Sequence, residues 1–143
     1  MSYSQVADLL NQLLESHYHA DYVYREGIKK TDSTSLKKFF MDMASKKAQM
    51  INQLTDDIIR LNEKPREKDD FGETAANVWS ELMLFFSGNS EGAILNECKK
   101  AEEALIREYN EVLKYSSITQ STRVLLESHR QQIQEDLNVS FNI

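Results

Sequence analysis

Five ionisable side chains fall where amphipathic helices are expected to place apolar ones: His17, Asp21, Lys47, Glu102 and His129. Burying a charged group costs several kcal/mol unless the group is paired, hydrogen-bonded or bound to a metal. Imidazoles and carboxylates are also ligands of transition metals. These five side chains therefore define the candidate functional site, which we call the polar layer.

Four long segments repeat apolar residues every three or four positions, which is the period of an amphipathic helix. The pattern predicts long helices over about residues 4–30, 36–61, 91–113 and 125–141. A shorter helix is expected over about residues 71–86. With only 4 Gly and 1 Pro in 143 residues, the chain has little capacity for many short strands and tight turns.

The connections between these helices predict the topology. Short turns at residues 31–33 and 116–119 make each pair of long helices an antiparallel hairpin. The middle connection, residues 63–89, is long enough to run along the bundle and return the third long helix parallel to the second. The expected fold is all-α, a ferritin-like four-helix bundle with a long, helix-containing crossover, in a single domain over residues 1–143.

This topology brings the polar layer close to one level of the bundle. The first hairpin places His17 opposite a residue near Lys47, and the second places His129 about one turn from the residue opposite Glu102. If the second and third long helices are parallel, Lys47 and Glu102 lie at comparable heights.

A di-metal site of the ferritin-like type needs a carboxylate from each of two helices and a Glu-x-x-His from each of the other two. The sequence contains no Glu-x-x-His, and Glu127-Ser128-His129 has the wrong spacing because side chains two residues apart diverge on a helix. The second helix offers Lys47 where a ligand would be needed. A redox-active di-metal site is therefore not expected.

Two interpretations of the polar layer follow. In the favoured one, Lys47 neutralises Asp21 and Glu102, His17 and His129 bridge them by hydrogen bonds, and no cofactor is needed. The protein then has a structural or interaction role and no expected catalytic activity. In the alternative, His17, Asp21, Glu102 and His129 bind one iron, zinc or manganese ion, and the protein is a metal-binding protein or an oxidoreductase.

Several segments carry a resemblance to a known family. They are Tyr24-Arg25-Glu26, residues 36–40, the crossover helix with Trp79, and above all the stretch EGAILNECKKAEE at residues 91–103. With these segments the chain resembles a bacterial family of ferritin-like four-helix-bundle proteins described as a domain of unknown function. The resemblance covers nearly the whole chain and implies the fold. It implies no activity, because the family has no settled one.

The crossover helix carries a candidate contact surface. Residues 82–86 read Leu-Met-Leu-Phe-Phe, so this helix is apolar on every side, and one side needs a cover. We expect a contact surface through Trp79, Met83, Phe85 or Phe86. The cover is either a second copy of the chain, in a homo-oligomer, or the long loop of the same chain.

Composition narrows the remaining possibilities. A net charge of −6 argues against nucleic acid as a partner, because the phosphates would repel the protein. No stretch has the length and apolarity of a membrane span, and no secretory leader is evident. The single cysteine, Cys98, is expected to be a buried thiol, which fits a reducing cytoplasm.

Overall fold

The computed structural model describes residues 2–68, 77–139 and 141. The long helices are α1 (Tyr3–Lys30), α2 (Thr34–Arg60), α4 (Glu91–Leu113) and α5 (Gln120–Val139). Between α2 and α4 lie the short helix α3 (Val78–Met83) and the 3-10 helix η2 (Leu84–Phe86). Every regular element in the described ranges is helical.

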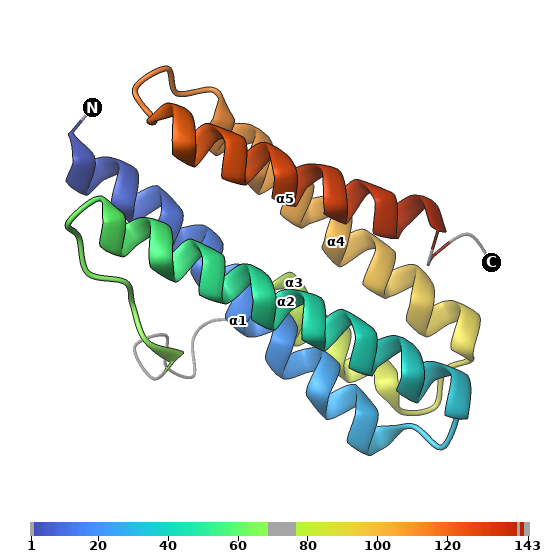
Figure 1. Ribbon diagram of the computed structural model, residues 1–143. Helices are drawn as coiled ribbons and strands as arrows, with labels where there is room; N and C mark the ends of the chain where they lie inside the picture. The colour runs from blue at the N-terminus through green and yellow to red at the C-terminus, as the bar shows by residue number, and fades with distance from the viewer. Residues whose placement is uncertain (1, 69–76, 140, 142–143) are drawn as a thin grey trace.

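The helices form two antiparallel hairpins, α1 with α2 and α4 with α5, and α2 and α4 run in the same direction (Figure 1). The end of α2 and the start of α4 lie at opposite ends of the bundle (Figure 1). The predicted ferritin-like bundle with a long, helix-containing crossover is therefore confirmed. Of the crossover helix expected over residues 71–86, the structure shows α3 and η2, and residues 71–76 lie outside the described residues.

Serine side chains cap the starts of α2 and α4. The hydroxyl of Ser33 accepts a hydrogen bond from the backbone N–H of Leu36 and so caps α2. Ser90 accepts from Ala93 in the same way at the start of α4. Each cap satisfies a backbone N–H that has no partner within the helix, and this sets the first turn of that helix.

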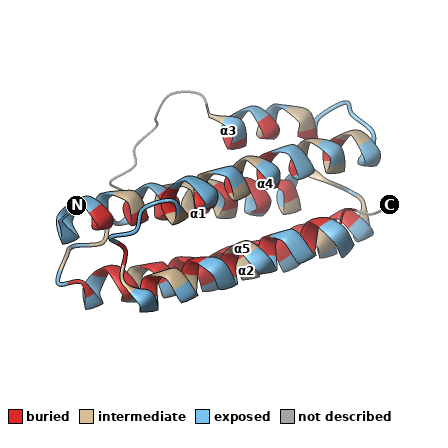
Figure 2. Ribbon diagram, turned by 90° about the horizontal axis from the view of Figure 1, so that it is seen from above, coloured by how far each residue is buried: buried red, intermediate tan, exposed pale blue. Residues whose placement is uncertain are grey.

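The buried faces of the four long helices point toward one another (Figure 2). The short helix α3 lies over the side formed by α1 and α4, where Figure 2 shows it as an additional layer. Trp79 of α3 packs against Tyr24 with ring centroids 5.6 Å apart, and Phe86 packs against Phe40 at 5.4 Å. The crossover helix is thus part of the hydrophobic core.

This packing corrects part of the predicted contact surface. Trp79 is 2% exposed and Phe86 is 8% exposed, so neither can face a partner, and for these two residues the prediction is wrong. Met83 and Phe85 are half-buried. The exposed apolar side chain of this segment is Leu84, with 79% of its surface accessible, because the 3-10 turn rotates it away from the bundle.

No helix in the described part of the chain is both long enough and apolar enough to cross a membrane.

Candidate functional site: a buried polar network

A buried ion pair joins α2 and α4 in the middle of the bundle. The ammonium nitrogen Nζ of Lys47 lies 2.7 Å from Oε2 of Glu102, and both side chains are 1% exposed. The other carboxylate oxygen, Oε1, accepts a hydrogen bond of 2.8 Å from the hydroxyl of Tyr24 on α1. Glu102 therefore has a partner on each oxygen, as a carboxylate buried away from water requires.

A second hydrogen-bonded group lies further along the bundle. The hydroxyl of Tyr109 is 2.7 Å from Nε2 of His17 and 2.8 Å from Nδ1 of His129. The other ring nitrogen of His129, Nε2, is 2.8 Å from the amide oxygen of Gln53 on the exposed side of α2. This chain of hydrogen bonds connects all four long helices.

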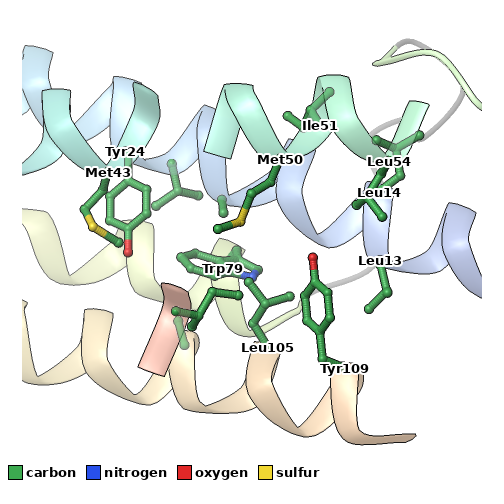
Figure 3. Close-up of a cluster of buried hydrophobic side chains, with 14 of the residues drawn as sticks. Leu13, Leu14, Tyr24, Met43, Met50, Ile51, Leu54, Trp79, Leu105 and Tyr109 are labelled. Atoms are coloured by element: carbon green, nitrogen blue, oxygen red, sulfur yellow. The ribbon is translucent and has the colours of Figure 1, made fainter. Parts of the chain in front are cut away.

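The two groups occupy two levels of the bundle. Tyr24 and His17 are seven residues apart on α1, and Glu102 and Tyr109 are seven residues apart on α4. Seven residues correspond to about two helical turns, or roughly 10 Å. Figure 3 shows the hydroxyls of Tyr24 and Tyr109 pointing in opposite directions across the core. The expected single layer is thus two layers, with Tyr24 and Glu102 in one and His17 and Tyr109 in the other.

The hydrogen-bond partners assign the protons. Because the amide oxygen of Gln53 can only accept, neutral His129 carries its proton on Nε2 and accepts at Nδ1 from the Tyr109 hydroxyl. The oxygen of Tyr109 then accepts from Nε2–H of His17. Nδ1 of His17 is left as a lone-pair acceptor, and it has no hydrogen-bond partner.

The surroundings favour the neutral form of both histidines. Burial, followed by the positive charge of Lys47 and the proximity of His129, holds the pKa of His17 well below 6.5. Burial and the charge of Lys47 lower the pKa of His129 from 6.5 to about 4. The network is therefore built from neutral imidazoles and one ion pair.

Burial also keeps the hydroxyl groups of Tyr24 and Tyr109 protonated, so both remain hydrogen-bond donors. Burial, reinforced by the negative charge of Glu102, raises the pKa of Tyr24 well above 10. Burial and the charges of Glu108 and Glu102 do the same to the pKa of Tyr109. Burial also raises the pKa of the Cys98 thiol, with smaller effects of Glu102 and Glu97, so this cysteine is protonated.

Asp21 does not belong to the network, and its predicted place in the polar layer is wrong. Its carboxylate is 13% exposed and pairs with Arg25, one turn further along α1, at 3.0 Å. The partner of Lys47 is Glu102, and the partner of Asp21 is Arg25. The reason is rotational: four residues turn a helix by about 400°, so Asp21 lies about 40° away from His17 around α1, toward solvent.

The alternative metal ligands do not converge. Asp21 faces Arg25, Glu102 is held by Lys47 and Tyr24, and the two histidines are separated by the Tyr109 hydroxyl. Within the residues that the structure describes, no three His, Cys, Asp or Glu side chains are arranged to hold a metal ion. As they stand, the donor atoms present do not fit a ferritin-like metal centre.

Sequence reasoning missed three members of the network, namely Tyr24, Tyr109 and Gln53. Both tyrosines lie on apolar stripes of their helices, where a buried tyrosine usually needs a partner for its hydroxyl. Their seven-residue spacing from His17 and Glu102 was the available signal. Gln53 lies on the exposed side of α2, and nothing in the sequence pattern distinguishes it from other surface residues.

The fold and this site define the class: a ferritin-like four-helix bundle whose centre holds a lysine–glutamate ion pair. The sequence profile of the family described as "Domain of unknown function (DUF2383)" matches residues 5–115, and the chain belongs to this family. Comparison with curated proteins finds no sequence match.

Solved structures agree with the class. A mutant of Dps1 from Mycobacterium smegmatis superposes with a TM-score of 0.76 at 13% identity, over 94% of this chain and 91% of that one. A dodecameric thioferritin, the bacterioferritin-related protein from Bacteroides fragilis, gives a TM-score of 0.68 at 16% identity, over 96% and 84% of the two chains. At these identities the likeness shows the fold alone.

Proposed function

We propose that this protein is a ferritin-like bundle without a catalytic metal, which acts as a structural or interaction subunit. The observation that carries the proposal is the Lys47–Glu102 ion pair, 2.7 Å long and buried at the centre of the bundle. Ferritin-like di-metal sites place inward-facing carboxylates at the centre of the bundle. An ammonium group there neutralises a carboxylate and repels a second cation.

Metal analysis of protein purified without added chelator or metal tests this proposal. We expect iron, zinc and manganese well below one ion per chain, and no change in metal content in the variant Glu102→Gln. Stoichiometric metal in the wild type that is lost in Glu102→Gln would overturn the proposal, because Glu102 would then be a ligand.

One observation keeps the metal-binding alternative open to test. Nδ1 of His17 is a buried acceptor with no partner, and an imidazole lone pair is a ligand for iron, zinc or manganese. In this second candidate function, His17, Asp21, Glu102 and His129 rearrange around an added ion. Added metal would then raise the unfolding temperature, and His17→Gln would abolish that rise.

We also propose that the chain forms a homo-oligomer in the cytoplasm. Leu84 and Val78 expose apolar surface on the same short segment, next to the half-buried Met83 and Phe85. Apolar side chains grouped in this way are typical of contact surfaces. The thioferritin that shares this fold is described as dodecameric, which supports an assembly of copies.

The buried, protonated Cys98 is compatible with a reducing compartment such as the cytoplasm.

A further inference from the structure

The hydrogen bonds around Tyr109 form a directed path from the core to the surface. The phenol is fully buried, donates its proton toward Nδ1 of His129 and accepts from Nε2–H of His17. A single partner would satisfy the O–H donor of a buried tyrosine, so the second imidazole beside Tyr109 is not needed for its burial. The arrangement holds an acceptor base 2.8 Å from the phenolic oxygen before any reaction begins.

His129 connects this phenol to the surface. Its ring lines a hollow of about 210 Å³ between α2 and α5, whose other lining residues are Lys46, Gln49, Met50, Gln53, Ser128 and Gln132. The Nε2–H of His129 points to Gln53 at this hollow. A proton that arrives at Nδ1 can therefore be matched by a proton that leaves from Nε2 into the hollow when the exposed Gln53 side chain turns away, and the imidazole ring itself need not move.

The same hollow brings a small molecule close to the phenol. The ring centroids of Tyr109 and His129 are 5.8 Å apart, so one imidazole separates an occupant of the hollow from the phenol. Electron loss from a phenol is easier when its proton leaves at the same time, because no buried cation is formed. Both the electron and the proton of Tyr109 can therefore reach the hollow between α2 and α5 through His129.

We propose that Tyr109 is a one-electron redox site that quenches small oxygen-centred radicals. The radical takes one electron from Tyr109 and is reduced to its anion. The phenolic O–H bond breaks, a new N–H bond forms at Nδ1 of His129, and the Nε2 proton of His129 passes to the reduced oxidant in the hollow. The product is a neutral tyrosyl radical, which keeps the hydrogen bond from Nε2–H of His17.

The surroundings favour release of this proton over its storage. The positive charge of Lys47 and burial both disfavour an imidazolium at position 129. The proton therefore continues into the hollow. This inference does not depend on the oligomeric state or on the structural role proposed above.

Tyr24 provides a matched comparison within the same chain. It is equally buried and donates at 2.8 Å to Glu102, but that carboxylate is already neutralised by Lys47. A proton placed on Glu102 would break the ion pair, and the described partners of this carboxylate, Tyr24 and Lys47, are both donors that cannot pass it on. Oxidation at Tyr24 is therefore disfavoured relative to Tyr109.

Flash oxidation with photogenerated tris(bipyridine)ruthenium(III), followed by electron paramagnetic resonance, tests the proposal. The wild type should give a persistent tyrosyl radical, since surface tyrosyl radicals decay by coupling while a buried one is protected. Tyr109→Phe should lose most of this persistent signal, and Tyr24→Phe should retain it. His129→Gln keeps a hydrogen-bond acceptor that cannot take a proton, so its radical yield should fall severalfold.

An unchanged persistent signal in Tyr109→Phe, or an unchanged yield in His129→Gln, would overturn the proposal. If Tyr109→Phe fails to fold by circular dichroism, fluorotyrosine placed at position 109 retains the hydroxyl and the packing. The radical should then show fluorine hyperfine splitting, and a spectrum without that splitting would place the radical elsewhere.

Discussion

At the scale of single residues, the ion pair at the centre of the bundle makes the sharpest prediction. Lys47→Met keeps most of the side-chain volume but leaves Glu102 without its cation. Removal of one partner of a buried pair typically costs about 3–5 kcal/mol. We expect this loss in urea unfolding at neutral pH, and we expect Lys47→Met with Glu102→Gln to recover much of it, because no stranded carboxylate remains.

Lys114→Met is the control for this experiment. Lys114 pairs with Glu111 at 2.7 Å, both side chains are largely exposed, and such pairs contribute at most about 1 kcal/mol. A neutral effect of Lys47→Met would mean that the ion pair does not stabilise the bundle.

The histidines predict how stability depends on pH. The pKa of His129 falls from 6.5 to about 4 on folding, so between these values the unfolded chain binds more protons than the folded one. Stability from this group is complete above pH 6.5 and declines as the pH falls toward 4, by up to about 1.4 kcal/mol per pH unit. His129→Gln should flatten this dependence. Unfolding midpoints measured from pH 7 to pH 4 test this prediction. Parallel curves of midpoint against pH for wild type and His129→Gln would contradict it.

At the scale of elements, the contact between α1 and α2 depends on Gly27. A Cβ atom built there would lie 2.8 Å from two ring carbons of the fully buried Phe40. Gly27→Ala should therefore destabilise the bundle by about 1–3 kcal/mol, because the buried Phe40 ring or the helix backbone must shift to make room for the added methyl group.

Gly92→Ala is the matched control, since a Cβ at this helical position of α4 meets no atom within 4 Å. It should be neutral or should stabilise by about 0.5–1 kcal/mol, because alanine loses less entropy than glycine on entering a helix. Thermal unfolding of the two variants measures both effects. Equal unfolding temperatures for the two variants would show that the hairpin tolerates a wider helix spacing.

At the scale of the whole molecule, substitutions in η2 can separate the contribution of this segment to assembly from its contribution to folding. Leu84 is 79% exposed, so Leu84→Asp should leave helicity unchanged and reduce the oligomeric state in sedimentation. Val124→Asp is the control, because Val124 is 57% exposed on a different helix, near the start of α5. A wild type that stays monomeric at high concentration would remove the homo-oligomer from the proposed function.

Phe86→Asp should act differently, because Phe86 belongs to the core and packs on Phe40. A buried, unpaired carboxylate should lower the stability itself. We expect Phe86→Asp to lower the helicity or the unfolding midpoint, and Leu84→Asp to leave both unchanged. That difference would separate the role of η2 in the core from its role in assembly. If both variants kept full stability, η2 would not be packed as described.

The sequence by itself determined the four long helices, their capped starts and the long crossover, because helical period, capping residues and connection lengths are local properties. It also predicted the burial of His17, Lys47, Glu102 and His129, since each occupies an apolar stripe.

Only the tertiary structure decided which side chains are partners. The rotation of each helix about its axis, and its shift along that axis, come from packing against the neighbouring helices and not from its own periodicity. That rotation leaves Asp21 outside the network, places Tyr109 between two imidazoles, and packs Trp79 on Tyr24 and Phe86 on Phe40. A shift of one residue in any helix would have produced a different network from the same stripes.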